Sequence, residues 1–284
     1  MSYQTLIDAQ TLQQQFRQAD WRVFDCRFSL ADTGAGQHAY EAAHIPDAHY
    51  LHLDHDLSSA VTPRSGRHPL PDPEILAARL RACGLNQGMQ VVVYDDSSGM
   101  MAARAWWLLR WLGHREVAVL DGGIQAWLAA GYALDDQGVE HPSGNFQPRQ
   151  QGDFTVDTAT LSGPNNWQLV DARSAERFRG ESEPIDPVAG HIPGAWNRAN
   201  ALSLQDGKFK SPEILRREWL ALLNGTTPDR IVHMCGSGVT ACHNQLSMEI
   251  AGLSGTRLYP GSWSRWIRDA SRPTAKGPEQ KTTT

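Results

Sequence analysis

The chain has 284 residues, of which 40% are hydrophobic and 20% charged, and its formal net charge is −5. This composition allows two domains of ordinary size, each with a buried core. The chain has neither the basic blocks typical of nucleic-acid binding nor an apolar run of the roughly 18 residues that a membrane helix needs. Because its first residues also lack the apolar core of a signal peptide, we expect a cytoplasmic protein.

Four short motifs follow one another in the first half of the chain. They are V-F-D-C-R at 23–27, H-I-P-D-A at 44–48, V-V-V-Y-D at 91–95 and L-D-G-G-I-Q-A-W at 120–127. The second half repeats them in the same order, about 140 residues further on. These copies are L-V-D-A-R at 169–173, H-I-P-G-A at 191–195, I-V-H-M-C at 231–235 and Y-P-G-S-W-S-R-W at 259–266. We interpret this order as an internal repeat.

Between these motifs, short apolar runs alternate with amphipathic stretches. Residues 90–94 and 115–120 indicate buried strands, and residues 73–83 and 102–112 indicate helices. This alternation predicts an α/β chain of two tandem domains, each a parallel sheet with helices on both faces. In such sheets, active sites lie at the carboxyl ends of the strands.

A stretch rich in Gly, Pro, Gln and Asn separates the two halves and predicts a linker. We therefore divide the chain into an N-terminal domain at 1–134, a linker at 135–152, a C-terminal domain at 153–273 and a polar tail at 274–284. We expect this tail to be disordered. Since the two halves should cover one another, we expect a monomer.

The sharpest local signal is the sequence C-G-S-G-V-T-A at 235–241, which follows an apolar strand and precedes a helix expected to begin near Thr240. At this junction Cys235 would face backbone N–H groups and the positive end of the helix dipole. Gly236 and Gly238 would let those amides curl around one point. We expect this loop to favour the thiolate, which is the nucleophilic form. The alternative is a buried cysteine in an ordinary strand-to-helix turn.

The corresponding loop of the first half has Asp95 where the second half has Cys235. A nucleophile in only one copy of the repeat suggests a single active site. The other cysteines, Cys26, Cys83 and Cys242, form no C-x-x-C pair, and we expect them to be free thiols in the cores. We predict no metal site and no cofactor.

Together, the two H-I-P motifs, the cysteine loop and the paired D-G-G and P-G-S-W endings resemble the tandem-domain rhodanese family over about residues 5–270. The resemblance implies a catalytically inactive N-terminal domain and an active C-terminal domain. It also implies that Cys235 carries sulfur as a persulfide between a small-molecule donor and an acceptor, which would be a small thiol, thioredoxin or cyanide.

The residues after the cysteine distinguish two branches of this family. Members that use thiosulfate typically carry Arg and Lys there, whereas members that use 3-mercaptopyruvate typically carry Gly-Ser-Gly, as this chain does. The resemblance therefore favours 3-mercaptopyruvate as the donor, with thiosulfate as the alternative. It also implies that the loop residues bind the donor; these are Gly236, Gly238, Val239 and Thr240.

Three further positions match the family one at a time. Arg177 matches the arginine that binds the donor's anionic group, and its alternative is a surface salt bridge. Asp171 matches a residue that supports the active-site loop, which is compatible with turn capping. Phe28 falls where the family has an aromatic wall of the cleft, although a core phenylalanine is an equally good interpretation.

The resemblance also implies a proton relay of Ser237, Asp54 and His68, which would deprotonate the donor thiol or protonate the enolate left behind. Asp54 and His68 could instead be surface residues, and Ser237 a small loop residue without a chemical role. One departure concerns the stretch 183–191, where many mercaptopyruvate enzymes have a second arginine and this chain has Asp186. A second residue that binds the donor carboxylate is therefore either missing or supplied by another part of the chain, and Arg198 is a candidate.

Two other functions compete with sulfur transfer. Some cysteine phosphatases share this fold, but their loop has an arginine six residues after the cysteine, and this chain has Ala241 there. Some rhodanese domains are binding modules without activity. The first half fits that description, whereas the second half retains its cysteine and glycines.

Overall fold

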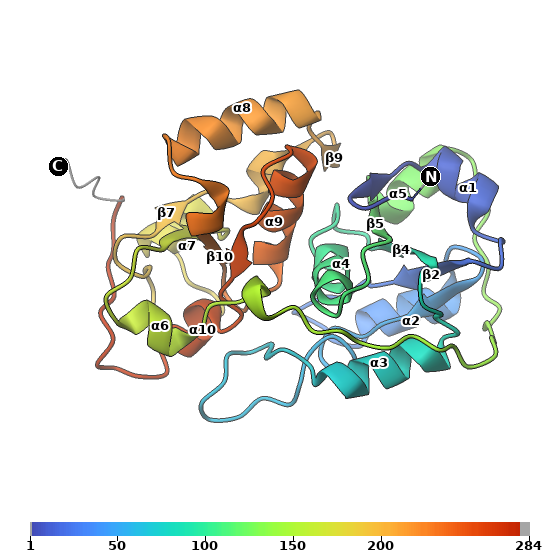
Figure 1. Cartoon of the computed structure of the whole chain (residues 1–284), viewed down its shortest axis with the longest axis horizontal. Helices are drawn as coiled ribbons and strands as arrows, with labels where there is room; N and C mark the ends of the chain where they lie inside the picture. Colours follow the sequence, from blue (N-terminus) through green and yellow to red (C-terminus); the bar gives the residue numbers. More distant parts are fainter. Residues whose placement is uncertain (1, 279–284) are drawn as a thin grey trace. The chain divides into compact units, whose positions relative to one another are not determined.

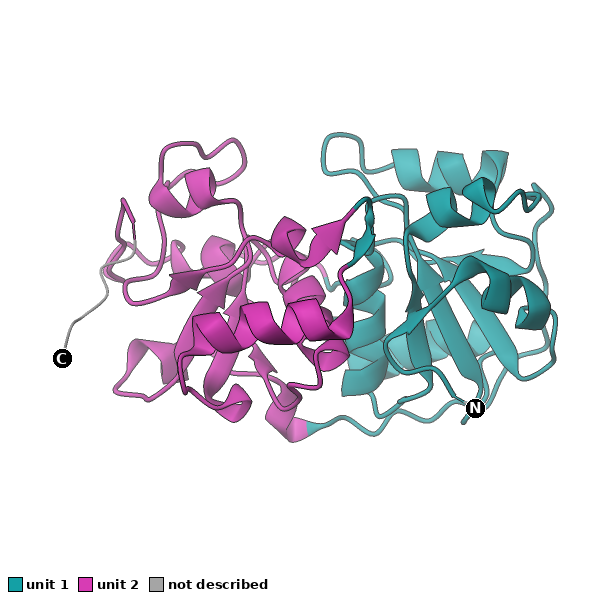
Figure 2. Cartoon of the chain, turned by 90° about the horizontal axis from the view of Figure 1, so that it is seen from above, with its two compact units in different colours: residues 1–59, 70–151, 206–209 teal, residues 60–69, 152–205, 210–284 magenta. Residues whose placement is uncertain are grey.

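The computed structural model describes residues 2–278, which form two compact units (Figures 1 and 2). The first unit comprises the residues up to 59, together with 70–151 and 206–209. The second comprises 60–69, 152–205 and the residues from 210 onwards. The segment 60–69 therefore belongs to the second unit, although in the sequence it lies between elements of the first. The predicted division at the linker placed this segment in the N-terminal domain.

A parallel sheet of five strands forms the centre of the first unit, in the order β1-β5-β4-β2-β3. These strands are β1 (Leu6–Ile7), β2 (Trp21–Asp25), β3 (Ala48–Tyr50), β4 (Gln90–Tyr94) and β5 (Val117–Leu120). The apolar run at 90–94 predicted β4 over its full length, while β5 starts later than predicted. Every residue of β2, β4 and β5 is buried, as a sheet with both faces covered requires.

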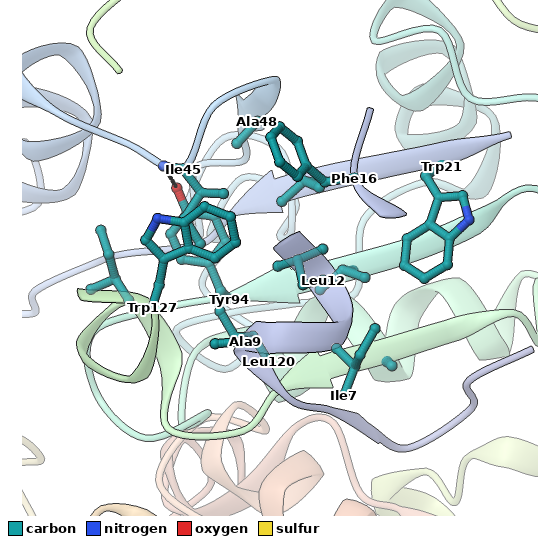
Figure 3. Packing of buried hydrophobic residues seen from close by; sticks show 14 residues of the cluster. Ile7, Ala9, Leu12, Phe16, Trp21, Ile45, Ala48, Tyr94, Leu120 and Trp127 are labelled. Carbon is teal, nitrogen blue, oxygen red and sulfur yellow. Dashed lines mark hydrogen bonds between the residues drawn. The ribbon is translucent and has the colours of Figure 1, made fainter. Parts of the chain in front are cut away.

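Helices cover both faces of this sheet. They are α1 (Ala9–Gln15), α2 (Ala35–Ala42), α3 (Pro73–Ala82), α4 (Ala102–Trp111) and α5 (Gly123–Ala129). The helix α3 begins where Asp72 caps the amides of Glu74 and Ile75 and where Pro73 occupies the first turn. On one face, α1 and α5 meet through Phe16 and Trp127, whose rings pack edge to face at 5.7 Å (Figure 3).

The second unit is built in the same way. Its parallel sheet has the order β11-β10-β6-β7. The strands are β6 (Gln168–Asp171), β7 (Trp196–Asn197), β10 (Ile231–Met234) and β11 (Arg257–Leu258), and the short strand β8 (Leu204–Gln205) also belongs to this unit. The strand β9 (Lys208–Phe209) belongs to the first unit. The helices of the second unit are α6 (Thr158–Ser162), α7 (Ala175–Arg179), α8 (Pro212–Leu223), α9 (Thr240–Ile250) and α10 (Ser262–Trp266).

The structure confirms the internal repeat, because the order β11-β10-β6-β7 reproduces β5-β4-β2-β3 of the first sheet. Each strand in this series stands at the same place in its half of the sequence as its counterpart does. The counterpart of β1 is reduced to a single parallel bridge between Thr155 and Leu258. The fold is thus α/β throughout, with two tandem parallel sheets.

Order continues into the segment predicted to be a disordered tail. Ala275 and His191 exchange two backbone hydrogen bonds of 2.9 Å, and the amide of Gly277 donates to the carbonyl of Arg179. The rest of that predicted segment, 279–284, lies outside the described residues. Among residues 2–278, no helix has the length and apolar character that crossing a membrane would take.

Candidate active site

The candidate nucleophile Cys235 follows β10 directly, at the carboxyl end of a central strand of the second sheet (Figure 1). The loop 235–239 then leads into α9, which begins at Thr240 as predicted. Cys235 is only 2% exposed, so water has little access to its sulfur. The strand, the loop and the helix N-terminus thus meet where parallel sheets place their active sites.

The loop directs a backbone amide at the sulfur. The N–H of Gly238 donates a hydrogen bond to Cys235 Sγ over 3.1 Å. Gly238 has a φ of +82°, and a Cβ on it would lie 2.6 Å from the carbonyl oxygen of Pro260. Only glycine fits this turn, and the turn presents the amide to the sulfur. Val239 is buried behind it, and Thr240 opens the helix whose dipole favours negative charge at this end.

Ser262 holds the backbone of the cysteine from the other side. Its hydroxyl oxygen accepts a hydrogen bond from the amide of Cys235 (3.1 Å) and donates to the carbonyl of Tyr259 (2.9 Å). Ser262 has a φ of +51°, a left-handed conformation that is rare for a residue with a Cβ. Ser262 was not among the site residues predicted from the sequence. The available signal was the repeat, which has Gly123 at the corresponding place.

Asp171 lies at the end of β6 and is fully buried. It forms an ion pair with Arg173 (2.7 Å), whose guanidinium stacks 4.9 Å from the centre of the Trp263 ring. The amide of Trp263 in turn donates to the carbonyl of Cys235. Burial works against the charge of Arg173, but the nearby carboxylates of Asp171 and Glu183 outweigh it and raise the pKa of Arg173. Asp171 is thus linked to the cysteine loop through Arg173 and Trp263, and its role as a support of that loop stays a prediction.

Arg177 lies on α7, which Ser174 caps. Its Nη2 bonds Glu183 Oε1 over 2.7 Å, and its side chain is 18% exposed. Burial works against the charge of Glu183, but hydrogen bonds from Arg177 and from backbone amides outweigh it and lower the pKa of Glu183 below its usual range. A Cβ placed on Gly236 would lie 3.6 Å from Arg177 Nη2, so the guanidinium is close to the loop.

His68 and Ser237 lie together in the second unit. His68 Nδ1 is 2.7 Å from Ser237 Oγ, and both residues are buried. The structure therefore brings together two members of the predicted relay from positions far apart in the sequence. The imidazole can accept a proton from the hydroxyl or return one, which is the requirement for general acid–base chemistry.

The other predicted site residues of the first half belong to the first unit. The amide of Asp54 donates to His52 Nδ1 (3.0 Å), and Phe28 packs edge to face on His52, with ring centres 5.4 Å apart. Their proposed roles at the cysteine loop stay predictions.

Arg198, the candidate for a second donor-binding arginine, has its guanidinium engaged by other residues, and its role in donor binding stays a prediction. Its guanidinium bonds Ser203 over 2.7 Å and Glu218 over 3.0 Å, and it stacks on Trp219. Arg67 was not predicted as a site residue, yet its guanidinium lies against the loop: a Cβ on Gly236 would lie 2.7 Å from Arg67 Nη2. Its position in the first half of the sequence did not suggest a role at the cysteine loop, because only the three-dimensional structure shows that the segment 60–69 belongs to the second unit.

The loop of the first unit shows what the repeat has become without its cysteine. The carboxylate of Asp95 accepts four backbone hydrogen bonds of 2.7–2.9 Å. Their donors are the amides of Ser97, Gly99, Met101 and Ala102. The corresponding loop of the first unit thus also directs backbone amides at one side chain, the carboxyl group of Asp95.

The arrangement in the second unit supports covalent nucleophilic chemistry at one sulfur. An amide donates to the sulfur, a histidine–serine pair can move a proton, and arginine side chains lie beside the loop. All four cysteines are free; Cys26, Cys83 and Cys242 are buried, as predicted, and Cys235 is buried as well. Within residues 2–278, His, Cys, Asp and Glu side chains form no group of three that could hold a metal ion.

Comparisons with known proteins match both halves of the repeat. A family model described as a rhodanese-like domain matches residues 8–130 and 157–269. A probable 3-mercaptopyruvate sulfurtransferase from Pseudomonas aeruginosa is 50% identical over 283 residues, covering 98% of this chain and 100% of that protein. A putative thiosulfate sulfurtransferase from Mycobacterium tuberculosis is 38% identical over 263 residues, or 90% of each chain. The solved structure of a 3-mercaptopyruvate sulfurtransferase from Leishmania major matches with a TM-score of 0.82 and 31% identity, covering 92% of this chain and 73% of that one.

Proposed function

This chain belongs to the rhodanese-like sulfurtransferases, and we propose that it takes sulfur from 3-mercaptopyruvate through a persulfide on Cys235. Such an enzyme needs a small-molecule sulfur donor and a thiol acceptor. The observation that carries the proposal is the amide of Gly238, which donates to Cys235 Sγ within a Gly-Ser-Gly loop. An amide so placed favours a negatively charged sulfur, both before attack and in the persulfide that follows.

The reaction balances without an external oxidant or reductant. The thiolate of Cys235 attacks the donor sulfur, a sulfur–sulfur bond forms, and the carbon–sulfur bond breaks. The electron pair of that bond goes to carbon as the pyruvate enolate, which takes up one proton to give pyruvate. A second thiol, or cyanide, then removes the outer sulfur and restores Cys235. Small thiols, reduced thioredoxin and cyanide are the acceptors that we expect.

His68 and Ser237 would handle the proton. Their 2.7 Å contact allows the hydroxyl of Ser237 to give its proton to the enolate while His68 supplies Ser237 with a replacement proton. Arg177 would bind the carboxylate of the donor, because its planar fork matches a carboxylate with two parallel hydrogen bonds. Asp54 and Phe28 would complete the site as the family resemblance implies.

Thiosulfate is the second candidate donor. Two guanidinium groups, those of Arg67 and Arg177, lie beside the loop and could each donate hydrogen bonds to the oxygens of thiosulfate. The Mycobacterium tuberculosis relative is named for that donor. Steady-state turnover of the two donors at equal concentrations, with a small thiol as acceptor, decides between them. A higher kcat/KM for 3-mercaptopyruvate supports the proposal, and a higher value for thiosulfate refutes it.

We expect the enzyme to work as a monomer in the cytoplasm. Four unpaired cysteines suit a reducing compartment. Large apolar side chains with high exposure, such as Val61 and Ile75, are scattered along the chain, and single exposed apolar residues are normal on monomers.

A further inference from the structure

The structure brings a second cation to the cysteine loop from a distant part of the sequence. The amide of Arg67 donates to Ser264 Oγ (3.1 Å), which anchors its backbone to the second unit. Its guanidinium then lies so close to the loop that a Cβ on Gly236 would meet Arg67 Nη2 at 2.7 Å. The same point is 3.6 Å from Arg177 Nη2. Two guanidinium groups therefore converge on the residue that follows Cys235.

Asp186 sits between these two cations. Its Oδ1 bonds Arg67 Nη1, and its Oδ2 lies 3.4 Å from Arg177 Nη2. The Asp186 side chain is only 3% exposed, and burial raises its pKa although Arg67 lowers it. A buried carboxylate is costly unless it is paired, so Asp186 depends on these arginines. In return, it fixes the direction of the Arg67 guanidinium.

The Arg67 guanidinium has bonding capacity beyond Asp186. Its side chain is 24% exposed, and its Nε is buried without a hydrogen-bond partner among the described residues. A guanidinium has five N–H donors in a fixed fork, which matches a carboxylate. The carboxylate of a donor bound at the loop would therefore contact a second guanidinium, that of Arg67, which Asp186 already holds in position.

Charge also distinguishes this cluster from a simple pair of cations. Arg67, Arg177 and Arg173 face the carboxylates of Asp186, Glu183 and Asp171, so the three positive and three negative charges cancel. Such a cluster offers hydrogen-bond donors to an anion with less net positive charge than two free arginines would supply. Electrostatic attraction in a partly buried site falls accordingly, and it falls more for a dianion than for a monoanion.

We propose that Arg67 is the second arginine that binds the donor's carboxylate and that Asp186 is a positioning residue that holds Arg67 and disfavours doubly charged donors. This inference rests on the proposed function. The stretch 183–191 lacks the second arginine that many mercaptopyruvate enzymes have there. Arg67, from the first half of the sequence, would take over its role of binding the donor carboxylate. Asp186 lies in the stretch where many mercaptopyruvate enzymes have that arginine, and here it holds the guanidinium of Arg67 instead.

The test compares two donors that differ only in the carboxylate: 3-mercaptopyruvate and mercaptoacetone, the same keto-thiol without the acid group. In Arg67→Met, kcat/KM for 3-mercaptopyruvate should fall roughly 10–100-fold, mainly through KM, since charge-assisted hydrogen bonds are lost. The value for mercaptoacetone should stay close to that of the wild type. Arg217→Met, on the exposed side of α8, is the matched control and should leave both donors unaffected.

A second variant controls for the loss of stability that an unpaired, buried Asp186 carboxylate could cause in Arg67→Met. The double variant Arg67→Met/Asp186→Asn removes both charges and should show the same selective loss for the carboxylate donor. Asp186→Asn alone should raise kcat/KM for thiosulfate relative to 3-mercaptopyruvate several-fold, because it restores positive charge.

The outcomes separate this inference from the proposed function. Equal losses for both keto-thiols would show that Arg67 only supports the loop, and unchanged values for both would show that it does not bind the donor; either result overturns the inference alone. A thiosulfate-to-mercaptopyruvate ratio that does not rise in Asp186→Asn overturns the role of Asp186. A wild-type enzyme that does not turn over 3-mercaptopyruvate overturns the proposed donor and, with it, a carboxylate-binding Arg67.

Discussion

The imidazole Nδ1 of His68 lies 2.7 Å from the hydroxyl oxygen of Ser237, and both side chains are buried within the second unit. A short contact between a serine and a histidine beside a cysteine is suited to moving one proton. The enolate that leaves 3-mercaptopyruvate needs a proton, whereas the sulfite that leaves thiosulfate does not. The two donors therefore provide an internal test of what this pair does.

Ser237→Ala should lower kcat with 3-mercaptopyruvate by about 10²-fold, in line with the loss of general acid–base assistance. His68→Gln should do the same, because a glutamine can keep a hydrogen bond to Ser237 but cannot carry the proton. Turnover with thiosulfate should change far less in both variants. Ser97→Ala, in the corresponding loop of the first unit, is the control. Equal losses with both donors would mean that the pair only shapes the loop.

Asp95 should stabilise the first unit through its four backbone hydrogen bonds. Asp95→Ala leaves buried amides without an acceptor, which should cost about 2–4 kcal/mol. Thermal unfolding and hydrogen exchange of peptides from α4 measure this loss. Asp96→Asn, at the neighbouring exposed position, should be nearly neutral. If Asp95→Ala unfolds at the wild-type temperature, the carboxylate is not holding the loop.

The two simplest substitutions of Ser262 should differ in stability. Both remove the hydroxyl that accepts a hydrogen bond from the amide of Cys235, and this loss should lower the free energy of unfolding by about 1–3 kcal/mol. Ser262→Gly also relieves the left-handed backbone, which costs a residue with a Cβ about 1–2 kcal/mol, so it should be more stable than Ser262→Ala. The melting temperature of the second unit measures the difference. An alanine variant as stable as the glycine variant would contradict the role of backbone strain here.

The histidine pair His49 and His141 predicts a loss of stability in acid. Their ring nitrogens lie 2.9 Å apart, and burial lowers the pKa of both, that of His49 to about 4. The unfolded chain takes up a proton near the usual value of about 6.5, so the stability is fully present above that pH and is lost as the pH falls towards 4.

For His49 alone, the free energy of unfolding of the first unit should drop by about 2 kcal/mol between pH 7.5 and pH 5. Urea titrations at the two pH values measure this change. His49→Gln should flatten the pH dependence, while the exposed control His38→Gln, on α2, should keep it. A pH dependence that is the same in His49→Gln and the wild type would rule out this origin.

Local pattern was enough to predict the two parallel sheets and the position of the cysteine loop. The run at 90–94, which is apolar after Gln90, became β4, and the small residues after Cys235 became the turn into α9. The repeat helped because each half supports the interpretation of the other. The strand order of the two sheets follows from that same duplication.

The parts of the site that the sequence analysis missed depend on contacts between distant segments. Arg67 reaches Asp186 across 119 residues of sequence, and no periodicity links the two. Sequence position also could not show that the guanidinium of Arg198, the candidate for the second arginine, bonds Ser203 and Glu218. Ser262 could have been found from the repeat, since a serine replaces the glycine at position 123 in a turn that needs a positive φ.

The central claim is that Cys235 carries the transferred sulfur. Intact-mass analysis of the protein after incubation with 3-mercaptopyruvate, without an acceptor, tests this claim most directly. We predict one added sulfur atom, located on the peptide that contains Cys235, retained in Cys83→Ala, absent in Cys235→Ser and removed by a small thiol. An unchanged mass in the wild type, or an added sulfur that persists in Cys235→Ser, would contradict the account.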